Sequence, residues 1–348
     1  MKAITKLAMT GVAAAVIMAG CSKDEPAATA AAGETQFRPA VVYDVAGKFD
    51  KSFNEAVFRN GVEVFVADKG VAVREFTPDN ESQREQAIRR LAQDGHSPIV
   101  TVGFNFGSSV SSVAADFPNT QFAIIDDVVD APNVQSLIFK EHEGSFLVGA
   151  LAALASETNT VGFVGGMDIP LIRKFACGYE QGAKYVNSDI RVLQNMTGST
   201  PTAFNDPVRG GELANSQISQ GADVIYAAAG GTGLGVYQTA ADRGIFAIGV
   251  DSNQNYLQPG TMLTSMEKRV GTAAYVSWEQ AMMGEWEGGV QVFGIAENGV
   301  DWSLDEFNRD LISTELEAQI NDIRNKIISG EIEVYDYMQN GDCNYAAM

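Results

Sequence analysis

The sequence is poor in the residues that carry metal and thiol chemistry. Its 348 residues include three Cys and two His, which leaves little material for a metal centre, a thiol nucleophile or a histidine-based acid–base pair. The HExxH, CxxC, GxSxG and complete P-loop motifs are also absent, and these accompany common hydrolytic, redox and nucleotide-hydrolysing sites. We therefore expect no catalytic residues, no metal and no cofactor.

Basic residues are scarce relative to acidic ones. The chain has 24 Lys and Arg against 44 Asp and Glu, a formal net charge of −20. Such a surplus of acid repels phosphate backbones, so nucleic acid is not an expected partner. With 45% hydrophobic and 20% charged residues the chain can bury cores, and its length suggests about two domains or lobes.

Long apolar runs are confined to the N-terminus. Two lysines precede the apolar run 7–20, which is too short to span a bilayer. This layout predicts a secretory signal peptide over residues 1–20.

The end of this segment, Met18-Ala19-Gly20-Cys21, resembles a bacterial lipobox. In such a site Cys21 is lipidated and becomes the new N-terminus, and the alternative is a plain signal peptide with an incidental Cys. Residues 21–37 are rich in Ala, Glu, Pro and Thr, which predicts a flexible tether. One lipidated Cys anchors a protein without spanning the membrane, so we expect a location on the cell membrane facing the periplasm or the exterior.

Export places the other two cysteines, Cys177 and Cys343, in an oxidising compartment. A disulfide between them would tie the C-terminal tail to the domain. Two free thiols, one buried and one in a loose tail, are the alternative.

From residue 40 the chain alternates short apolar runs with amphipathic segments. The predicted strands are 40–43, 71–73, 99–102, 122–125, 161–164, 190–193, 224–226 and 246–250, with two or three more between 260 and 340. The predicted helices are 80–94 with Asn80 as cap, 171–186, one opened by Asp206-Pro207, and two near 270–285 and 313–329. Apolar strands separated by helices are typical of parallel βαβ units, and two successive sheets predict an α/β protein with two similar lobes.

Three carboxylates, Asp44, Asp126 and Asp251, each terminate an apolar strand. Ligands of parallel α/β sheets bind beyond the carboxyl ends of the strands, where a carboxylate can accept hydrogen bonds from a vicinal diol or an amine edge. One such Asp alone is more simply a helix cap or loop residue, but three at equivalent positions favour a binding site.

A helix is predicted to start near Ser52, which forms a capping-box pattern with Glu55. This places Phe53 and Asn54 at the rim of the cleft. An aromatic ring there suits stacking on a flat ligand, worth about 1–3 kcal/mol; a hydrophobic plug between loops is the alternative.

Two further patterns carry weak signals. The glycine-rich turn 231–235 resembles a dinucleotide fingerprint, but Val236 stands where the last Gly belongs, so the turn indicates only a close approach of the backbone. His142 lies between two glutamates and could ligate a metal, although a polar helix start is the favoured interpretation.

Six blocks of the sequence together resemble the basic membrane protein family, lipoproteins similar to the purine nucleoside receptor of ABC transporters. The blocks are Asp50–Asn54, Glu141–Gly149, Gly165–Phe175, Gly178–Gly182, Gly249–Ser252 and Ser265–Arg269, and the resemblance extends over residues 38–340. It implies a type I periplasmic-binding-protein fold, in which two doubly wound parallel-sheet lobes are joined by three crossings and close on a nucleoside. We place lobe 1 at 38–155 plus about 269–295, and lobe 2 at 156–268 plus about 296–340.

The resemblance also implies a ligand site. Two aromatic rings would sandwich the base, an acid and a lysine would hold ribose hydroxyls, and further polar and backbone groups would complete the contacts. Matched by motif, Phe53 and Phe175 would sandwich the base, and Asp251 with Lys268 would hold the ribose hydroxyls. The further polar contacts would come from Asp44, Asn54 and Asp126, and the backbone contact from Gly231. The opening loop 44–49 is bulkier than the family's glycine-rich version, and Asn253 replaces a frequent Asp, so the choice of nucleoside stays open.

The resulting hypothesis is a monomeric, lipid-anchored protein that captures a nucleoside, which we expect to be a purine nucleoside, and delivers it to an ABC transporter permease. An exported sensor that signals occupancy to a membrane partner is the alternative. A nucleotide-dependent enzyme is disfavoured by the broken glycine fingerprint and the export signal.

Overall fold

The computed structural model describes residues 37–343. The predicted signal peptide, Cys21 and the tether up to residue 36 lie outside the described residues. In the described part, no helix is long and apolar enough to cross a membrane.

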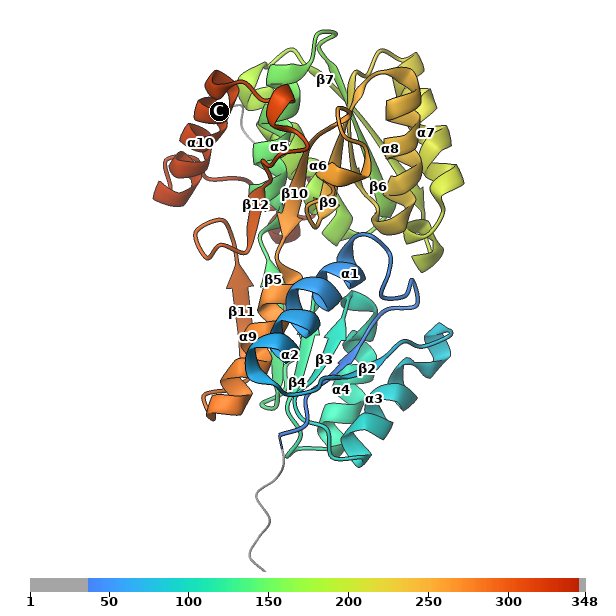
Figure 1. Ribbon diagram of the computed structural model, residues 1–348, viewed down its shortest axis with the longest axis vertical. Helices are drawn as coiled ribbons and strands as arrows, with labels where there is room; N and C mark the ends of the chain where they lie inside the picture. The colour runs from blue at the N-terminus through green and yellow to red at the C-terminus, as the bar shows by residue number, and fades with distance from the viewer. Residues whose placement is uncertain (1–36, 344–348) are drawn as a thin grey trace, which may run out of the picture. The chain divides into compact units, whose positions relative to one another are not determined.

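The chain forms two six-stranded sheets, each at the centre of one lobe (Figure 1). The first sheet has the order β11-β5-β4-β3-β1-β2, and each pair of neighbouring strands is parallel. Its strands are β1 (Ala40–Val42), β2 (Arg74–Phe76), β3 (Ile99–Val102), β4 (Phe122–Ile125), β5 (Val134–Phe139) and β11 (Gly289–Phe293). The second sheet has the order β12-β10-β9-β8-β6-β7, and only the β10–β12 pair is antiparallel. Its strands are β6 (Thr160–Met167), β7 (Arg191–Gly198), β8 (Val224–Ala228), β9 (Phe246–Asp251), β10 (Met262–Lys268) and β12 (Val300–Trp302).

Helices cover both faces of each sheet, as the apolar strands require. In lobe 1, α3 and α4 cover one face while α1, α2 and α9 cover the other. Their bounds are α1 (Phe53–Val57), α2 (Glu63–Lys69), α3 (Arg84–Gln93), α4 (Gly107–Asp116) and α9 (Val270–Met283), with a π-helical segment, Phe58–Val62, joining α1 to α2.

In lobe 2, α7 and α8 cover one face and α5 and α6 the other (Figure 1). The bounds are α5 (Glu141–Ala155), α6 (Pro170–Val186), α7 (Pro207–Ser219), α8 (Gly233–Arg243), α10 (Thr314–Ser329) and α11 (Tyr337–Asn340). The two doubly wound lobes confirm the predicted fold class.

Three crossings join the lobes, at Lys140 between β5 and α5, at Arg269 between β10 and α9, and over residues 294–299 between β11 and β12. They lie against one another, because the amide of Lys140 donates to the carbonyl of Phe293 (2.9 Å) and the amide of Arg269 donates to that of Gly299 (2.8 Å). The three segments therefore form one hinge.

The first crossing corrects the predicted boundary at residue 155, because α5 belongs to lobe 2. α5 packs along α6, and two glycines allow the close approach: a Cβ on Gly149 would lie 2.1 Å from the carbonyl oxygen of Tyr179, and one on Gly182 would lie 1.9 Å from that of Phe146. Lobe 1 therefore ends its first segment at Lys140.

Two other local predictions were wrong. The predicted strand 71–73 lies before β2, which begins at Arg74 because register with β1 pairs Ala40 with Arg74 and Val42 with Phe76. The predicted helix 80–94 begins as a 3-10 turn over Glu81–Gln83, and the Asn80 side chain accepts from the Ser82 hydroxyl instead of capping the backbone.

Candidate functional site

A cavity of about 350 Å³ lies between the carboxyl ends of the strands of the two sheets. Seven of the eight predicted ligand residues line it: Asp44, Phe53, Asn54, Asp126, Phe175, Asp251 and Lys268. They come from both lobes, so a molecule held here would touch both at once.

The eighth predicted residue, Gly231, does not line the cavity; its neighbour Gly230 does. Gly230 has a φ of +55° and begins the turn that precedes α8, so the backbone faces the cavity one residue earlier than the glycine pattern indicated. Gly231 is buried against the Phe204 carbonyl.

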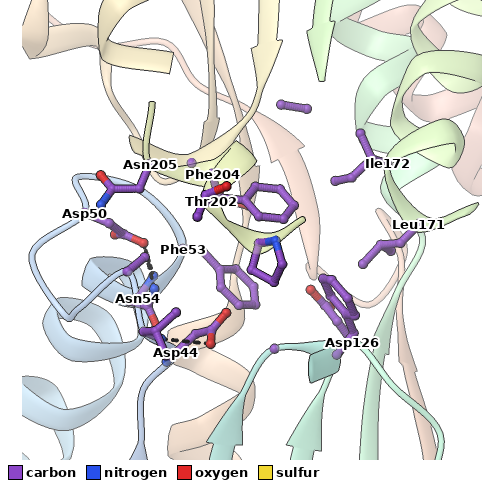
Figure 2. A pocket seen from close by; sticks show the side chains of 18 of the residues that line it. Asp44, Asp50, Phe53, Asn54, Asp126, Leu171, Ile172, Thr202, Phe204 and Asn205 are labelled. Atoms are coloured by element: carbon purple, nitrogen blue, oxygen red, sulfur yellow. Dashed lines mark hydrogen bonds between the residues drawn. The ribbon is translucent and has the colours of Figure 1, made fainter. Parts of the chain in front are cut away.

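Aromatic rings form much of the cavity wall. Phe53 of lobe 1 and Phe204 of lobe 2 both point into the cavity (Figure 2), and Phe104 and Phe175 also line it. Gly166 makes room for Phe204, since a Cβ there would lie 2.2 Å from the ring. Sequence reasoning missed Phe104 and Phe204, although Phe104 stands in the loop after β3 where the strand-end argument applies.

The floor of the cavity holds a buried lysine between two carboxylates. Nζ of Lys268 lies 2.6 Å from Oδ2 of Asp126 and 2.9 Å from Oε1 of Glu141. Lys268 is 1% exposed, and burial alone would lower its pKa, but Asp126, Glu141 and Asp251 outweigh burial and raise it. The ammonium also lies 5.2 Å from the ring centroid of Phe53, so Lys268 is held charged beneath an aromatic surface.

Asp126 keeps one acceptor free for a ligand. Its Oδ1 atom is buried with no hydrogen-bond partner in the described residues, and an unsatisfied buried acceptor is costly unless something donates to it. Burial raises the pKa of Asp126, and Lys268 only partly offsets it. The cavity therefore offers an acceptor and an ammonium side by side, which suits a hydroxyl-bearing ligand.

Asp251, the last residue of β9, receives a hydrogen bond from the Ser52 hydroxyl at 2.5 Å. This corrects the predicted capping box, because Ser52 binds the other lobe and makes no cap bond to α1. The cap is Asp50, whose carboxylate accepts from the backbone amides of Ser52, Asn54 and Glu55. Burial raises the pKa of Asp251 to about 7, although Lys268 and Ser52 oppose the change.

Asp44 and Asn54 are held within lobe 1. Asp44 accepts from Arg84 at 2.8 Å through Oδ1 and from Asn105 at 3.2 Å through Oδ2. Asn54 accepts from the Asp44 amide and donates to Asp50 (Figure 2). Both side chains thus fix the loop that follows β1 as well as bordering the cavity.

The structure pairs Cys177 of α6 with Cys343 in a disulfide. The tail is further attached to α6 by Gln181, which donates to the carbonyl of Tyr335 (3.0 Å) and accepts from its amide (2.9 Å). The disulfide therefore fixes the tail behind the helix that carries Phe175.

His142 is buried away from the cavity lining, 4.0 Å from Asp336. Burial lowers its pKa, and Lys174 lowers it further. Among residues 37–343, no three His, Cys, Asp or Glu side chains are grouped so as to hold a metal ion.

A two-lobed α/β fold with a cavity at the strand ends of both lobes is the architecture of ABC transporter solute-binding proteins. A crystal structure of an ABC transporter solute-binding protein from Aeropyrum pernix K1 has the same fold, with a TM-score of 0.78 and 29% identity over 85% of this chain and 92% of that one. Residues 37–337 match the Bmp family, described as PnrA-like ABC transporter substrate-binding proteins. The chain belongs to this family, which confirms the resemblance seen in the sequence.

Two curated relatives align over most of their length. The ABC transporter nucleoside-binding protein BmpA of Lactococcus lactis subsp. cremoris is 31% identical over 356 residues, covering 95% of this chain and 97% of the relative. A lipoprotein of Pyrococcus horikoshii is 32% identical over 322 residues, covering 88% of this chain and 78% of the relative.

Proposed function

We propose that this substrate-binding protein captures a nucleoside, with a purine as the preferred base, and presents it to an ABC permease from a lipid anchor at Cys21. Phe53 and Phe175 stack on the base in this proposal, and Lys268 with Asp251 binds the ribose hydroxyls. The name of the Lactococcus relative supports the ligand class, and the lipoprotein from Pyrococcus supports the anchor.

The observation that carries the proposal is the position of Lys268 beneath Phe53. A flat aromatic face lies 5.2 Å from an ammonium whose neighbours include the free acceptor of Asp126. A nucleoside has a flat base to stack and adjacent hydroxyls that both donate and accept. One ligand can therefore satisfy both halves of the site.

The charges in the cavity favour a nucleoside over a nucleotide. Asp44, Asp50, Asp126 and Asp251 line it, and Lys268 is its only lining Lys or Arg among the described residues. Because Lys268 already pairs with two carboxylates, a phosphate would meet mainly negative charge.

Closure follows from contacts made to both lobes. A ligand that touches Phe53 of lobe 1 and Asp251 of lobe 2 binds the closed form better than the open form, and so shifts the equilibrium toward closure. We expect the permease to recognise the closed form, with the protein acting as a monomer.

Calorimetry of the purified protein with adenosine, guanosine, inosine and uridine tests the proposal. Adenosine monophosphate and free ribose serve as matched controls that add a charge or remove the base. We expect heat with the purine nucleosides and much weaker binding of both controls. No heat with any nucleoside, together with tight binding of a sugar or an amino acid, would contradict the proposal.

A further inference from the structure

A second buried lysine, Lys174, lies beneath the site without lining it. It precedes Phe175 on α6 and is 4% exposed. Its Nζ atom donates to the carbonyl of Phe139 at 2.7 Å and lies 2.9 Å from Oε2 of Glu141. Phe139 is the last residue of β5 and Glu141 the first of α5. Lys174 therefore binds the first crossing on both sides of Lys140.

Glu141 connects Lys174 to the ligand site. One of its oxygens faces Lys174 and the other faces Lys268, each at 2.9 Å. Glu141 is 1% exposed, and an isolated carboxylate so deeply buried would take up a proton. It stays ionised because the two lysines outweigh burial and lower its pKa, with the charge of Lys174 as the largest opposing influence.

Titratable groups from several elements face this pair or the adjoining Lys268. They are Lys268 itself at the end of β10, Asp126 after β4, Asp251 of β9 (which acts on Lys268), the neutral His142 of α5, and Asp336 before α11. Asp336 lies 3.9 Å from Nζ of Lys174. Negative and positive groups therefore alternate from the C-terminal tail to the cavity floor.

We propose that Lys174 is a positioning residue for the ligand site: its ammonium holds the Glu141 carboxylate in place, so that Glu141 and Asp126 together hold the Lys268 ammonium under Phe53. Lys174 touches no ligand in this arrangement and acts only through Glu141. The inference rests on the proposed function, because the effect of Lys174 is read through ligand binding at Lys268.

The test compares inosine binding by calorimetry from about pH 5 to about pH 8 for the wild type, Lys174→Gln, Glu141→Gln and the double variant. Gln at 174 removes the charge but keeps a donor for the Phe139 carbonyl. Lys174→Met, which removes both, is the second variant. Arg173→Met is the matched control, because Arg173 is the preceding residue of α6 and pairs with Asp168 outside the cluster.

We expect Lys174→Gln to weaken inosine binding about tenfold at neutral pH and progressively more toward acid pH, because Glu141 then takes up a proton and releases Lys268. In the double variant this added pH dependence disappears, since the titrating group is gone. Arg173→Met should bind as the wild type does. Binding by both Lys174 variants that matches the wild type at every pH would overturn the inference, as would an added pH dependence that survives Glu141→Gln.

A failure of the proposed function looks different. In that case the wild type itself gives no heat with inosine. The coupling between Lys174 and Glu141 is then judged from thermal unfolding of the wild type, Lys174→Gln, Glu141→Gln and the double variant. If the stability changes of the two single variants simply add up in the double variant, the inference is overturned.

Discussion

The Ser52 hydroxyl of lobe 1 donates a hydrogen bond of 2.5 Å to Oδ2 of Asp251 in lobe 2. The contact is buried, and it is accompanied by a 2.7 Å hydrogen bond from the Gln254 side chain to the Lys51 carbonyl. The start of α1 is thereby attached to the end of β9. Phe53, the next residue along, is presented to the cavity by the same attachment.

Asp251 makes stability depend on pH in an unusual direction. Its pKa is about 7 in the folded protein against 3.8 for an ordinary Asp, so the folded state holds the proton more tightly. Its contribution to the free energy of unfolding is therefore present at low pH and lost as pH rises from about 4 to about 7. We expect Asp251→Asn to remove this loss, on the order of 2–4 kcal/mol, in denaturant unfolding measured across that range. A difference between variant and wild type that does not change with pH would contradict the prediction.

Phe53→Ala should weaken nucleoside binding by about 1–3 kcal/mol, because a stacking face is lost. Titration calorimetry with the tightest-binding nucleoside measures the change. Phe49→Ala is the control, since Phe49 is 59% exposed and does not line the cavity. Equal affinities for the two variants would remove Phe53 from the site.

Loss of the Cys177–Cys343 disulfide should lower stability by about 2–4 kcal/mol, because the bridge closes a long loop in the unfolded chain. Chemical unfolding of the wild type with and without reductant measures this loss. Cys343→Ser should unfold at the same denaturant concentration in both conditions. A reductant effect that persists in Cys343→Ser would show that the bridge is not its cause.

Cys21→Ser should move the protein from the membrane fraction to the soluble fraction of cells that export it, because the proposed anchor is a single lipidated residue. Immunoblots of fractionated cells measure the distribution. Cys177→Ser serves as the matched cysteine control and should stay with the membrane. Membrane retention of Cys21→Ser would mean that something else holds the protein there.

Sequence patterns predicted the strands that are buried on both faces well. They predicted poorly the exposed edge strand, whose position is fixed by pairing with its neighbour. β3 and β4 occupy the predicted residues 99–102 and 122–125, because a strand buried on both faces must be apolar throughout. β2 lies at the edge of its sheet, where pairing with β1 fixes its position. Its own residues, Arg74–Phe76, carry no continuous apolar signal.

The candidate site shows the same division. Strand-end position was enough to find Asp44, Asp126 and Asp251, which all line the cavity. Glu141 and Lys174 had no such signal, because a buried ion pair is defined by partners distant in the chain. Ser52 was misassigned to a local cap for the same reason, since its partner lies 199 residues away.

The three crossings mean that neither lobe is a continuous piece of sequence. The first sheet gains its edge strand β11 only after β6–β10 have been made, and the second gains β12 later still. During synthesis the chain cannot complete either sheet until nearly all of it has been made. Truncation at the first or second crossing would leave both sheets short of at least one strand, and truncation at the third would leave the second sheet without β12. Both lobes therefore need nearly the whole chain to fold.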